Sequence, residues 1–374
     1  MNEFKLKPSI IYGEDSLDYL KKLKSKKVFI VTDKVMVQLK IVNRVTDIFN
    51  SLNIPVVIFD QVEPNPTVET VEKGLKMMIE ADADTIIGFG GGSPIDACKA
   101  MLYFQLKFYE TLNVNKDKSM FIAIPTTSGT GSEVTSYSVI TNNSSKIALS
   151  RDEMLPDVAI LNPAFTRTLP KPVIADTGID ALTHAIEAYV SNKRSPFTNS
   201  MAIEAIELLY KNLLKHYSNV EELSYRMNVQ QASCLAGIAF NNSSLGINHS
   251  LAHTIGGKFH ISHGRSNAII LPYVIYENMK AIPEIYAEIS QKVGLPSRSV
   301  EEGCAALIIF VKEINKLMGI QNSFKEFGVK EDEFLAYIPT MIEDIKKDIC
   351  TGNNPKKLTD KEYEELLKKV YYGF

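Results

Sequence analysis

Apolar runs alternate with helical repeats along the first half of the chain. Short runs rich in Val, Ile and Phe predict strands at 28–33, 54–59, 84–89, 120–125 and 158–161. Between these runs, apolar residues recur at helical spacing over residues 35–51 and 67–81. Strands that are apolar throughout and separated by helices indicate a parallel sheet covered on both faces.

The second half of the chain has a different pattern. Residues 136–140 and 146–150 predict a hairpin around Asn142 and Asn143, before the last strand. After Pro172 the apolar positions follow helical spacing, and we expect helices at 174–191, 198–217, 221–241, 245–257, 266–281, 283–293, 299–318, 331–349 and 359–371. The prolines of segment 169–172 therefore mark the expected boundary between an α/β domain, 1–172, and a helical domain, 173–374.

A glycine-rich turn follows the strand at 84–89, with the sequence Gly90-Gly91-Gly92-Ser93-Pro94-Ile95-Asp96. We expect Ser93 to be the N-cap of the next helix, with Pro94 at the first helical position and Asp96 at the capping-box position. Glycines before a helix let a phosphate approach the backbone N–H groups and the positive end of the helix dipole. Because a tight turn alone needs fewer glycines, the segment is interpreted as a phosphate-binding turn.

Two further polar segments are expected at the carboxyl edge of the sheet, where α/β folds bind ligands. The loop Thr126–Thr135 is rich in hydroxyl groups and glycines and follows the strand at 120–125. Asp33 ends the first strand, where a carboxylate accepts hydrogen bonds from ribose hydroxyls and repels a 2′-phosphate. Asp33 could equally cap the following helix. The two roles are compatible, and we favour a preference for NAD(H).

The histidines gather between residues 177 and 264. Asp180 and His184 are four residues apart, as are His249 and His253, so each pair shares one face of a helix. A single histidine would indicate a core or surface residue, but this set, with His263, indicates a metal site. Imidazole and carboxylate ligands suit Fe(II), Zn(II), Co(II), Ni(II) or Mn(II) rather than Ca²⁺ or Mg²⁺. Since no paired thiolates accompany them, a structural cysteine-type zinc site is not expected.

Composition excludes several other classes of protein. The net charge of −3 over 374 residues gives no field that favours nucleic acid or an anionic membrane as partner. Four scattered cysteines indicate a reducing compartment, and no apolar segment has the length of a signal peptide or a membrane span. We therefore expect a cytoplasmic protein, within a bacterial microcompartment as the alternative, with no nucleic-acid or membrane partner.

Several motifs occur together in one order. They are Gly90-Gly91-Gly92-Ser93-x-x-Asp96-x-x-Lys99, the segment Pro125 to Glu133, Asp180-x-x-x-His184, His249-x-x-x-His253, His263-Gly264 and Asn354-Pro355-Lys356. As a set, and over nearly the whole chain, they resemble the iron-dependent (group III) alcohol dehydrogenases. Within that family the chain looks closest to 1-propanol and butanol dehydrogenases.

The resemblance implies a Rossmann-like dinucleotide-binding domain and an all-α metal domain of the dehydroquinate synthase-like fold, with the active site in the cleft between them. It implies one divalent metal, Fe²⁺ or Zn²⁺, on Asp180, His184, His249 and His263, and His253 beside the nicotinamide. It also implies NAD(H) contacts from Asp33, Asn65, Gly90, Gly91, Gly92, Ser93, Asp96, Thr126, Thr127, Thr130, Ser132, Thr135 and Lys146. We expect a homo-oligomer, a dimer or larger.

The expected activity is interconversion of short-chain primary alcohols and aldehydes, with hydride transfer to or from the nicotinamide and His253 as the proton relay. Two alternatives stay open. A dehydroquinate synthase-like lyase would need a basic pocket for a phosphorylated acid, and residues 177–190 contain no Lys or Arg. A non-catalytic metal-binding protein would not need the glycine-rich turn and the loop Thr126–Thr135.

Overall fold

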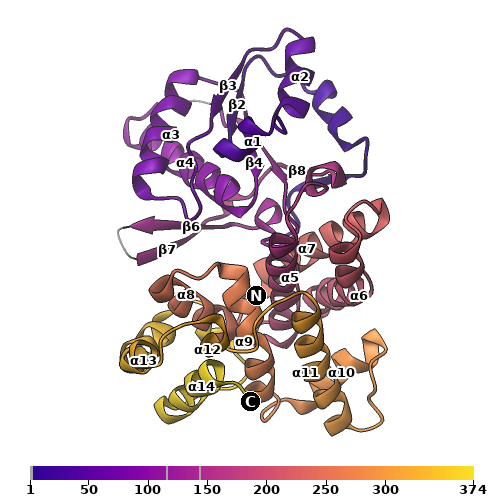
Figure 1. Ribbon diagram of the computed structural model, residues 1–374. Coiled ribbons are helices and arrows are strands. Elements are labelled where there is room, and N and C mark those ends of the chain that lie inside the picture. Colours follow the sequence, from indigo (N-terminus) through magenta and orange to yellow (C-terminus); the bar gives the residue numbers. More distant parts are fainter. Residues whose placement is uncertain (1–2, 115–116, 143–144) are drawn as a thin grey trace. The chain divides into compact units, whose positions relative to one another are not determined.

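The computed structural model describes residues 3–114, 117–142 and 145–374. The chain divides into two compact units, an α/β unit, Lys5–Thr168, and a helical unit, Leu169–Phe374, which also includes the N-terminal residues up to Phe4. Figure 1 shows both units, coloured along the sequence. Among the described residues, no helix is both long enough and apolar enough to cross a membrane.

A six-stranded sheet forms the centre of the α/β unit. In the order of the sheet, its strands are β1 (Ser9–Tyr12), β8 (Val158–Leu161), β5 (Met120–Pro125), β4 (Thr85–Gly90), β2 (Val28–Val31) and β3 (Val56–Phe59). Every pairing is parallel, so the predicted parallel sheet is confirmed. The short edge strand β1 has no counterpart in the predicted pattern. Gly90 pairs with Pro125, so the glycine-rich turn and the polar loop both begin at the same edge.

Both faces of this sheet are buried, because successive side chains of a strand point to opposite faces. Phe29 and Val31 pack on one side, under α3 (Val68–Ala81) and α4 (Gly92–Thr111). Val28 and Ile30 pack on the other side, together with Phe49 of α2 (Asn43–Ser51) and residues of the 3₁₀ helix η1 (Ser16–Lys22). Continuous apolar strands are the consequence of this double burial.

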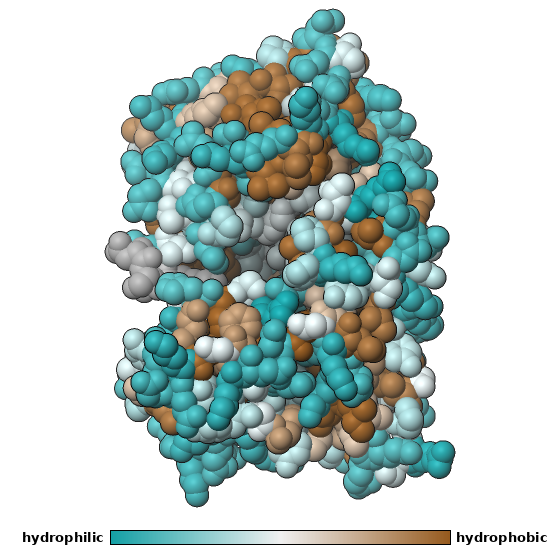
Figure 2. Space-filling model, viewed as in Figure 1, coloured by the Kyte–Doolittle hydropathy of each residue, from teal (hydrophilic) through white to brown (hydrophobic). Residues whose placement is uncertain are grey.

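The predicted single helix over residues 35–51 is wrong. The segment folds as α1 (Lys34–Gln38) and then α2, and the chain reverses between them at Lys40, which has a φ of 57°. The Asp33 side chain caps α1, and the N–H of Ile41 returns to the carbonyl of Met36 to close the turn. No glycine or proline marks this reversal in the sequence. Leu39, beside this reversal, is 61% exposed. Figure 2 shows that hydrophobic residues, in brown, also gather in patches on the surface of the molecule.

A two-stranded antiparallel hairpin, β6 (Tyr137–Asn142) and β7 (Ser145–Ser150), extends from the α/β unit (Figure 1). Both predicted strands of the hairpin are present, each slightly longer toward the turn. Asn143, at the predicted turn, lies outside the described residues. Three short 3₁₀ helices complete this unit. Helix η2 (Ser132–Val134) lies within the polar loop, and η3 (Asp152–Met154) and η4 (Pro163–Thr166) flank β8.

The described part of the helical unit contains no strand, as predicted. Its helices are α5 (Lys171–Val190), α6 (Pro196–Ser218), α7 (Leu223–Ser243), α8 (Ile247–Phe259), α9 (His263–Asn278), α10 (Pro283–Val293), α11 (Val300–Leu317), α12 (Phe324–Phe327), α13 (Glu331–Lys347), η5 (Thr351–Asn353) and α14 (Asp360–Tyr372). Thr359 and Glu362 form a capping box at the start of α14. The short α12 was not predicted, and α9 begins at His263 rather than at residue 266.

Helix α5 is buried along most of its length, because α6, α7 and α9 pack around it. Two glycines allow these close approaches. A Cβ on Gly178 of α5 would lie 2.2 Å from Leu213 of α6, and a Cβ on Gly264 of α9 would lie 2.4 Å from the carbonyl oxygen of Asp176. These contacts bring the start of α9 against α5, which positions the side chains described next.

Candidate functional site

One carboxylate and three imidazoles converge in the helical unit. Asp180 and His184 lie one turn apart on α5, His249 lies on α8, and His263 is the first residue of α9. One possible ligand atom from each of the four lies within 4.8 Å of the others. Asp180 is 2% exposed and His249 is 1% exposed, whereas the His263 side chain is 29% exposed. Asp180, His184 and His249 are thus buried, and the cluster is accessible at His263.

The electrostatics of this cluster suit a divalent cation. Burial raises the pKa of Asp180, because the carboxylate is removed from water, and this effect outweighs the opposing effects of His184 and of the hydrogen bond from Asn267. Burial, together with the neighbouring histidines, holds the pKa of His249 well below its usual value. The imidazole therefore stays neutral, which is the form that binds metals. A divalent ion would supply the positive charge that this set of donors lacks.

Asn267 lies at the centre of the cluster, one turn after His263 on α9. Its amide nitrogen donates to Asp180 Oδ1 at 2.7 Å and lies 3.2 Å from His249 Nε2 and 3.1 Å from His263 Nε2. Its amide oxygen accepts from Asn248 Nδ2 at 2.9 Å, which fixes the orientation of the amide. Asn267 was not predicted from the sequence, although the spacing of four from His263 is a usable signal.

Glu187 holds His249 from the opposite side. His249 Nδ1 and Glu187 Oε2 share a hydrogen bond, so that Nε2 is left for a ligand. The other carboxyl oxygen accepts the backbone N–H of Asn248 at 2.7 Å. Burial raises the pKa of Glu187 to about 8. A Cβ on Gly246 would lie 2.9 Å from this carboxylate, so the glycine makes room for it. Partners of this kind orient metal-binding histidines.

His253 is adjacent to the cluster but is not one of the four residues. Its ring stacks on that of His263 with centroids 5.2 Å apart, and its Nδ1 donates to Asp348 Oδ2 at 2.8 Å. Burial raises the pKa of Asp348, but the hydrogen bond and charge interaction with His253 outweigh it and lower the pKa to about 2. The carboxylate therefore fixes the tautomer of His253, with Nδ1 protonated and Nε2 free to accept a proton.

The glycine-rich turn of the α/β unit differs from its prediction. Helix α4 begins at Gly92, its N-cap is Gly91, and no side chain caps it, so the predicted Ser93 N-cap and Asp96 capping box are wrong. The helix starts earlier because Gly91 takes the extended N-cap conformation. A Cβ on Gly91 would lie 3.5 Å from Thr127, and one on Gly92 would lie 2.8 Å from Thr130. Uncapped N–H groups beside small residues suit a phosphate.

Asp33 lies beside this turn, because β2 and β4 are neighbours in the sheet. Its Oδ2 is 3.4 Å from the position of a Cβ on Gly90, which has a φ of 148°. Its Oδ1 accepts the N–H of Met36 at 3.0 Å and caps α1. The capping role is present, and one carboxylate oxygen faces the turn.

Lys99 ties the polar loop to α4. This fully buried amine donates to Ser132 Oγ at 2.8 Å, to Thr135 Oγ1 at 3.1 Å and to the Tyr137 carbonyl at 2.8 Å. Asp96 accepts from Ser132 Oγ at 2.5 Å and from the N–H of Val139 at 3.0 Å. Asp96, Ser132 and Thr135 therefore meet around a lysine that sequence reasoning placed in a motif but gave no role.

Burial shifts the pKa values of the titratable residues in this group, and it raises the pKa of Asp96. Burial lowers the pKa of Lys99 to about 8, against the opposing effect of Asp96 and Glu133. Burial raises the pKa of Glu133 to about 7. Thr126 joins the group through its N–H, which donates to the Gly90 carbonyl at 2.9 Å. The loop and the glycine-rich turn are thus one hydrogen-bonded assembly.

Three other predicted or discussed residues, Asn65, His216 and His260, lie apart from these groups, and the structure does not describe the side chain of a fourth. Asn65 lies in the loop before α3 with a φ of 57°, and in the described residues it has no hydrogen bond to the turn. The side chain of Lys146, in β7, lies outside what the structure describes. His216 is buried in α6, where burial and then Arg226 lower its pKa to about 4, and His260 ends α8. Neither histidine joins the cluster.

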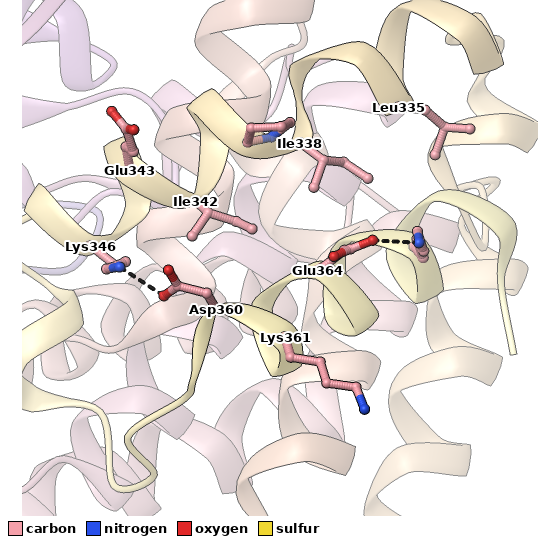
Figure 3. Close-up of a pocket in the computed structure, with 10 residues that line it drawn as sticks. Leu335, Ile338, Ile342, Glu343, Lys346, Asp360, Lys361 and Glu364 are labelled. Carbon is pink, nitrogen blue, oxygen red and sulfur yellow. Dashed lines mark hydrogen bonds and ion pairs between the residues drawn. The ribbon is translucent and has the colours of Figure 1, made fainter.

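A surface groove lies between α13 and α14 (Figure 3). Its apolar floor contains Leu335, Ile338 and Ile342, and its rim contains the ion pairs Lys346–Asp360 and Lys368–Glu364, at 2.7 Å and 2.6 Å. The charges along the rim pair with one another. The groove shares no residue with the histidine cluster, so it is not the site of the metal chemistry.

Comparison with known proteins defines the class of this one. Residues 8–163 match a family model described as iron-containing alcohol dehydrogenase, and residues 174–371 match the C-terminal part of the Fe-containing alcohol dehydrogenase family. The chain therefore belongs to the iron-containing alcohol dehydrogenase family. The expected family is confirmed, as are its fold and its activity as an NAD(P)-linked, metal-dependent alcohol dehydrogenase.

Particular relatives are similar over their full length. An NADPH-dependent butanol dehydrogenase from Clostridium saccharobutylicum is 43% identical, with 100% of this chain and 99% of the relative covered. The 1-propanol dehydrogenase PduQ from Citrobacter freundii is 34% identical, with 99% and 100% covered. A crystal structure of 1,3-propanediol oxidoreductase superposes with a TM-score of 0.91 at 31% identity, covering 99% and 100% of the two chains. Aldehyde-alcohol dehydrogenases also match, and the chain spans 46% of the length of one from Streptococcus pneumoniae serotype 4.

Proposed function

We propose that the protein interconverts short-chain primary alcohols and aldehydes of about the size of propanol and butanol. The observation that carries the proposal is the cluster of Asp180, His184, His249 and His263, buried on one side and accessible at His263. The names of the full-length relatives, a butanol and a 1-propanol dehydrogenase, support the substrate class. The reaction is reversible, so the ratio of reduced to oxidised cofactor decides whether aldehyde reduction or alcohol oxidation prevails.

The proposed metal ligands are Asp180, His184, His249 and His263, with Fe²⁺ as the native ion and Zn²⁺ as its substitute. When bound, the ion supplies a Lewis acid for the substrate oxygen and the nicotinamide supplies the hydride acceptor or donor. Glu187 fixes the ring of His249, and Asn267 fixes the carboxylate of Asp180. Both partners hold the donor atoms in place before an ion arrives, which reduces the entropy lost on binding.

His253 is the proposed proton relay. Its Nδ1–H is held by Asp348, so its Nε2 can take a proton from an alcohol and return it to an aldehyde. Its ring lies against that of the ligand His263, which places it near the reacting oxygen. Asp348 acts through His253 and is a positioning residue.

The α/β unit is proposed to bind the cofactor. Within the proposed cofactor domain, residues 1–172, the uncapped start of α4 would hold the pyrophosphate, and Asp33 would accept hydrogen bonds from the adenosine ribose. Residues 173–374 form the proposed metal domain. Gly90, Gly91, Gly92, Ser93, Thr126, Thr127, Thr130, Ser132 and Thr135 lie in this turn and loop. Asn65, Asp96 and Lys146 complete the proposed set.

NAD(H) is the proposed preference within the NAD(P) pair. Asp33 directs one carboxylate oxygen toward the glycine-rich turn, where a 2′-phosphate would meet its negative charge. The Clostridium relative is named NADPH-dependent, so the two cofactors must be compared directly. Steady-state kinetics with both, for wild type and Asp33→Gly, decide the matter. We expect NAD(H) preference in wild type and a shift toward NADP(H) in the variant; an unchanged kcat/KM ratio leaves Asp33 as a helix cap.

The substrate proposal has its own experiment. Reduction of a series of straight-chain aldehydes from ethanal to hexanal is measured with Fe(II)-loaded protein and a saturating cofactor. We expect the highest kcat/KM at propanal or butanal. A maximum at ethanal or at hexanal would contradict the proposed substrate size while leaving the dehydrogenase chemistry intact. We also propose a cytoplasmic or microcompartment location. We further propose that the protein is a homo-oligomer, and size-exclusion chromatography with light scattering tests its oligomeric state.

A further inference from the structure

A second group of possible metal ligands lies beside the first. His253 on α8, Asp348 at the end of α13 and Cys350 just after it each offer one donor atom, and the three atoms lie within 4.8 Å of one another. None of them belongs to the first cluster. This group includes a sulfur atom, whereas the first has only nitrogen and oxygen donors.

Hydrogen bonds hold the chain after α13 in place, so that these donor atoms are positioned before an ion binds. Asp348 Oδ1 accepts the N–H of Cys350 at 2.8 Å and the hydroxyl of Ser250 at 3.1 Å. The Thr351 hydroxyl donates to Ser250 Oγ at 2.8 Å. Since Ser250 lies on α8 three residues before His253, these bonds hold the Asp348–Thr351 segment against the helix that carries the imidazole. Cys350 forms no disulfide and is 6% exposed, and burial, with the charge of Asp348, raises the pKa of its thiol well above the usual value.

The chemistry of the three donors selects the cation. Thiolate, imidazole and carboxylate are the ligands of zinc, and the thiolate favours soft or borderline ions over hard ones. A fourth position is left for water. The first cluster, without sulfur, has no such preference.

We propose that His253 Nδ1, the Asp348 carboxylate and Cys350 Sγ form a second cation site, which takes Zn²⁺ or a similar thiophilic ion and thereby inhibits the enzyme. Binding forms one bond from the ion to each donor. It releases one proton to solvent, from the Cys350 thiol, while the ring proton of His253 moves from Nδ1 to Nε2, and no electron is transferred.

Inhibition follows from the tautomer of His253, and this part rests on the proposed relay. When Nδ1 is hydrogen-bonded to Asp348, the ring proton is on Nδ1 and Nε2 can accept a proton from the substrate. With Nδ1 on the cation, the single proton of the neutral ring must be at Nε2, which can no longer accept one. The metal of the first cluster stays in place while the relay is blocked.

Titration with Co²⁺ tests the site directly. Holoenzyme with its first site filled is titrated with Co²⁺, and the thiolate-to-cobalt charge-transfer absorption is followed in the near ultraviolet. We expect this band in wild type at about one added equivalent, its loss in Cys350→Ser, and its retention in Cys304→Ser. Cys304 is a matched control, since its buried thiol lies on α11 and donates to the Pro283 carbonyl at 3.2 Å.

Zinc inhibition is measured in parallel on the same proteins. The zinc concentration for half inhibition should rise at least about tenfold in Cys350→Ser and stay unchanged in Cys304→Ser. Absence of the thiolate band in wild type overturns the site even if Cys350→Ser fails to fold. Equal zinc inhibition of wild type and Cys350→Ser overturns the inhibitory role. The band should persist in His263→Ala, so failure of this site is distinguished from failure of the first one.

Discussion

His249 Nδ1 shares a hydrogen bond with the buried carboxyl group of Glu187, so that the opposite ring nitrogen faces Asp180. Glu187 follows Asp180 by two helical turns on α5, while His249 lies on α8. One helix therefore carries both a metal ligand and the group that orients another ligand. The arrangement makes the geometry of the site depend on the packing of α5 against its neighbours.

Glu187→Gln should weaken metal binding by about 10–100-fold, because the neutral amide holds the His249 ring less firmly and lowers its basicity. The apparent Zn²⁺ dissociation constant, measured by competition with a chelating dye, reports the change. Glu204→Gln, at an exposed position of α6, is the control. Equal metal affinity in wild type and Glu187→Gln would show that the hydrogen bond is only structural.

His253→Ala should keep its metal and lose about 10²–10⁴-fold in kcat, since the relay acts only when the proton moves. Metal content by mass spectrometry and kcat in buffers with and without added imidazole are the measurements. Imidazole should restore part of the rate. His260→Asn is the control, because asparagine tolerates the left-handed conformation at the end of α8. A metal-free His253→Ala protein would make His253 a ligand.

Gly91→Val should abolish cofactor binding without changing metal content. The backbone at Gly91 is extended with φ −72°, and a Cβ there would lie no closer than 3.5 Å to Thr127. The protein itself therefore accepts a Cβ at this position, and the valine methyl groups would occupy the space in front of α4. Calorimetric titration with NADH measures the loss. Wild-type affinity in Gly91→Val would place the pyrophosphate elsewhere.

Lys99 should give the stability of the protein a specific pH dependence. Between pH 8 and 10.5, the unfolded chain binds a proton on this amine that the folded chain has lost. The free energy of unfolding from this group therefore rises with pH across that window, by about 3 kcal/mol at most. In Lys99→Met the rise disappears.

The readout is the difference in Tm between wild type and Lys99→Met, measured by calorimetry from pH 7 to 10. It should move in favour of wild type as the pH rises through 8. Lys73→Met, on the exposed side of α3, controls for the loss of one surface charge. A Tm difference that is constant with pH would mean that Lys99 titrates normally in the folded protein.

Part of this structure was predictable from local patterns. Apolar runs located the strands of the sheet except β1, which is short and lies at the edge. A spacing of four residues correctly predicted that Asp180 lies next to His184 and that His249 lies next to His253, because such pairs share one face of a helix. The hydrogen-bond partners Glu187 and Asp348 were not predicted from the sequence, for different reasons.

Glu187 could have been found, since it lies one turn after His184 on the same helix. Asp348 could not, because it is 95 residues from His253 and only tertiary packing joins them. The wrong helix over residues 35–51 has a similar origin. The break at Lys40 depends on the helix cap by Asp33 and on backbone hydrogen bonds, and no residue type in the sequence indicates these hydrogen bonds.

The requirement for one metal ion in the Asp180, His184, His249 and His263 cluster is tested by removal and return of that ion. Wild type is stripped with a chelator, and one equivalent of Fe(II) is added without oxygen. Oxidation of NADH and NADPH is then followed with propanal. The stripped protein should be inactive, one equivalent should restore the rate, and His263→Ala should neither hold the metal nor recover, although its α/β unit still binds NADH. Full activity in the stripped protein, or in metal-free His263→Ala, would contradict the assigned site.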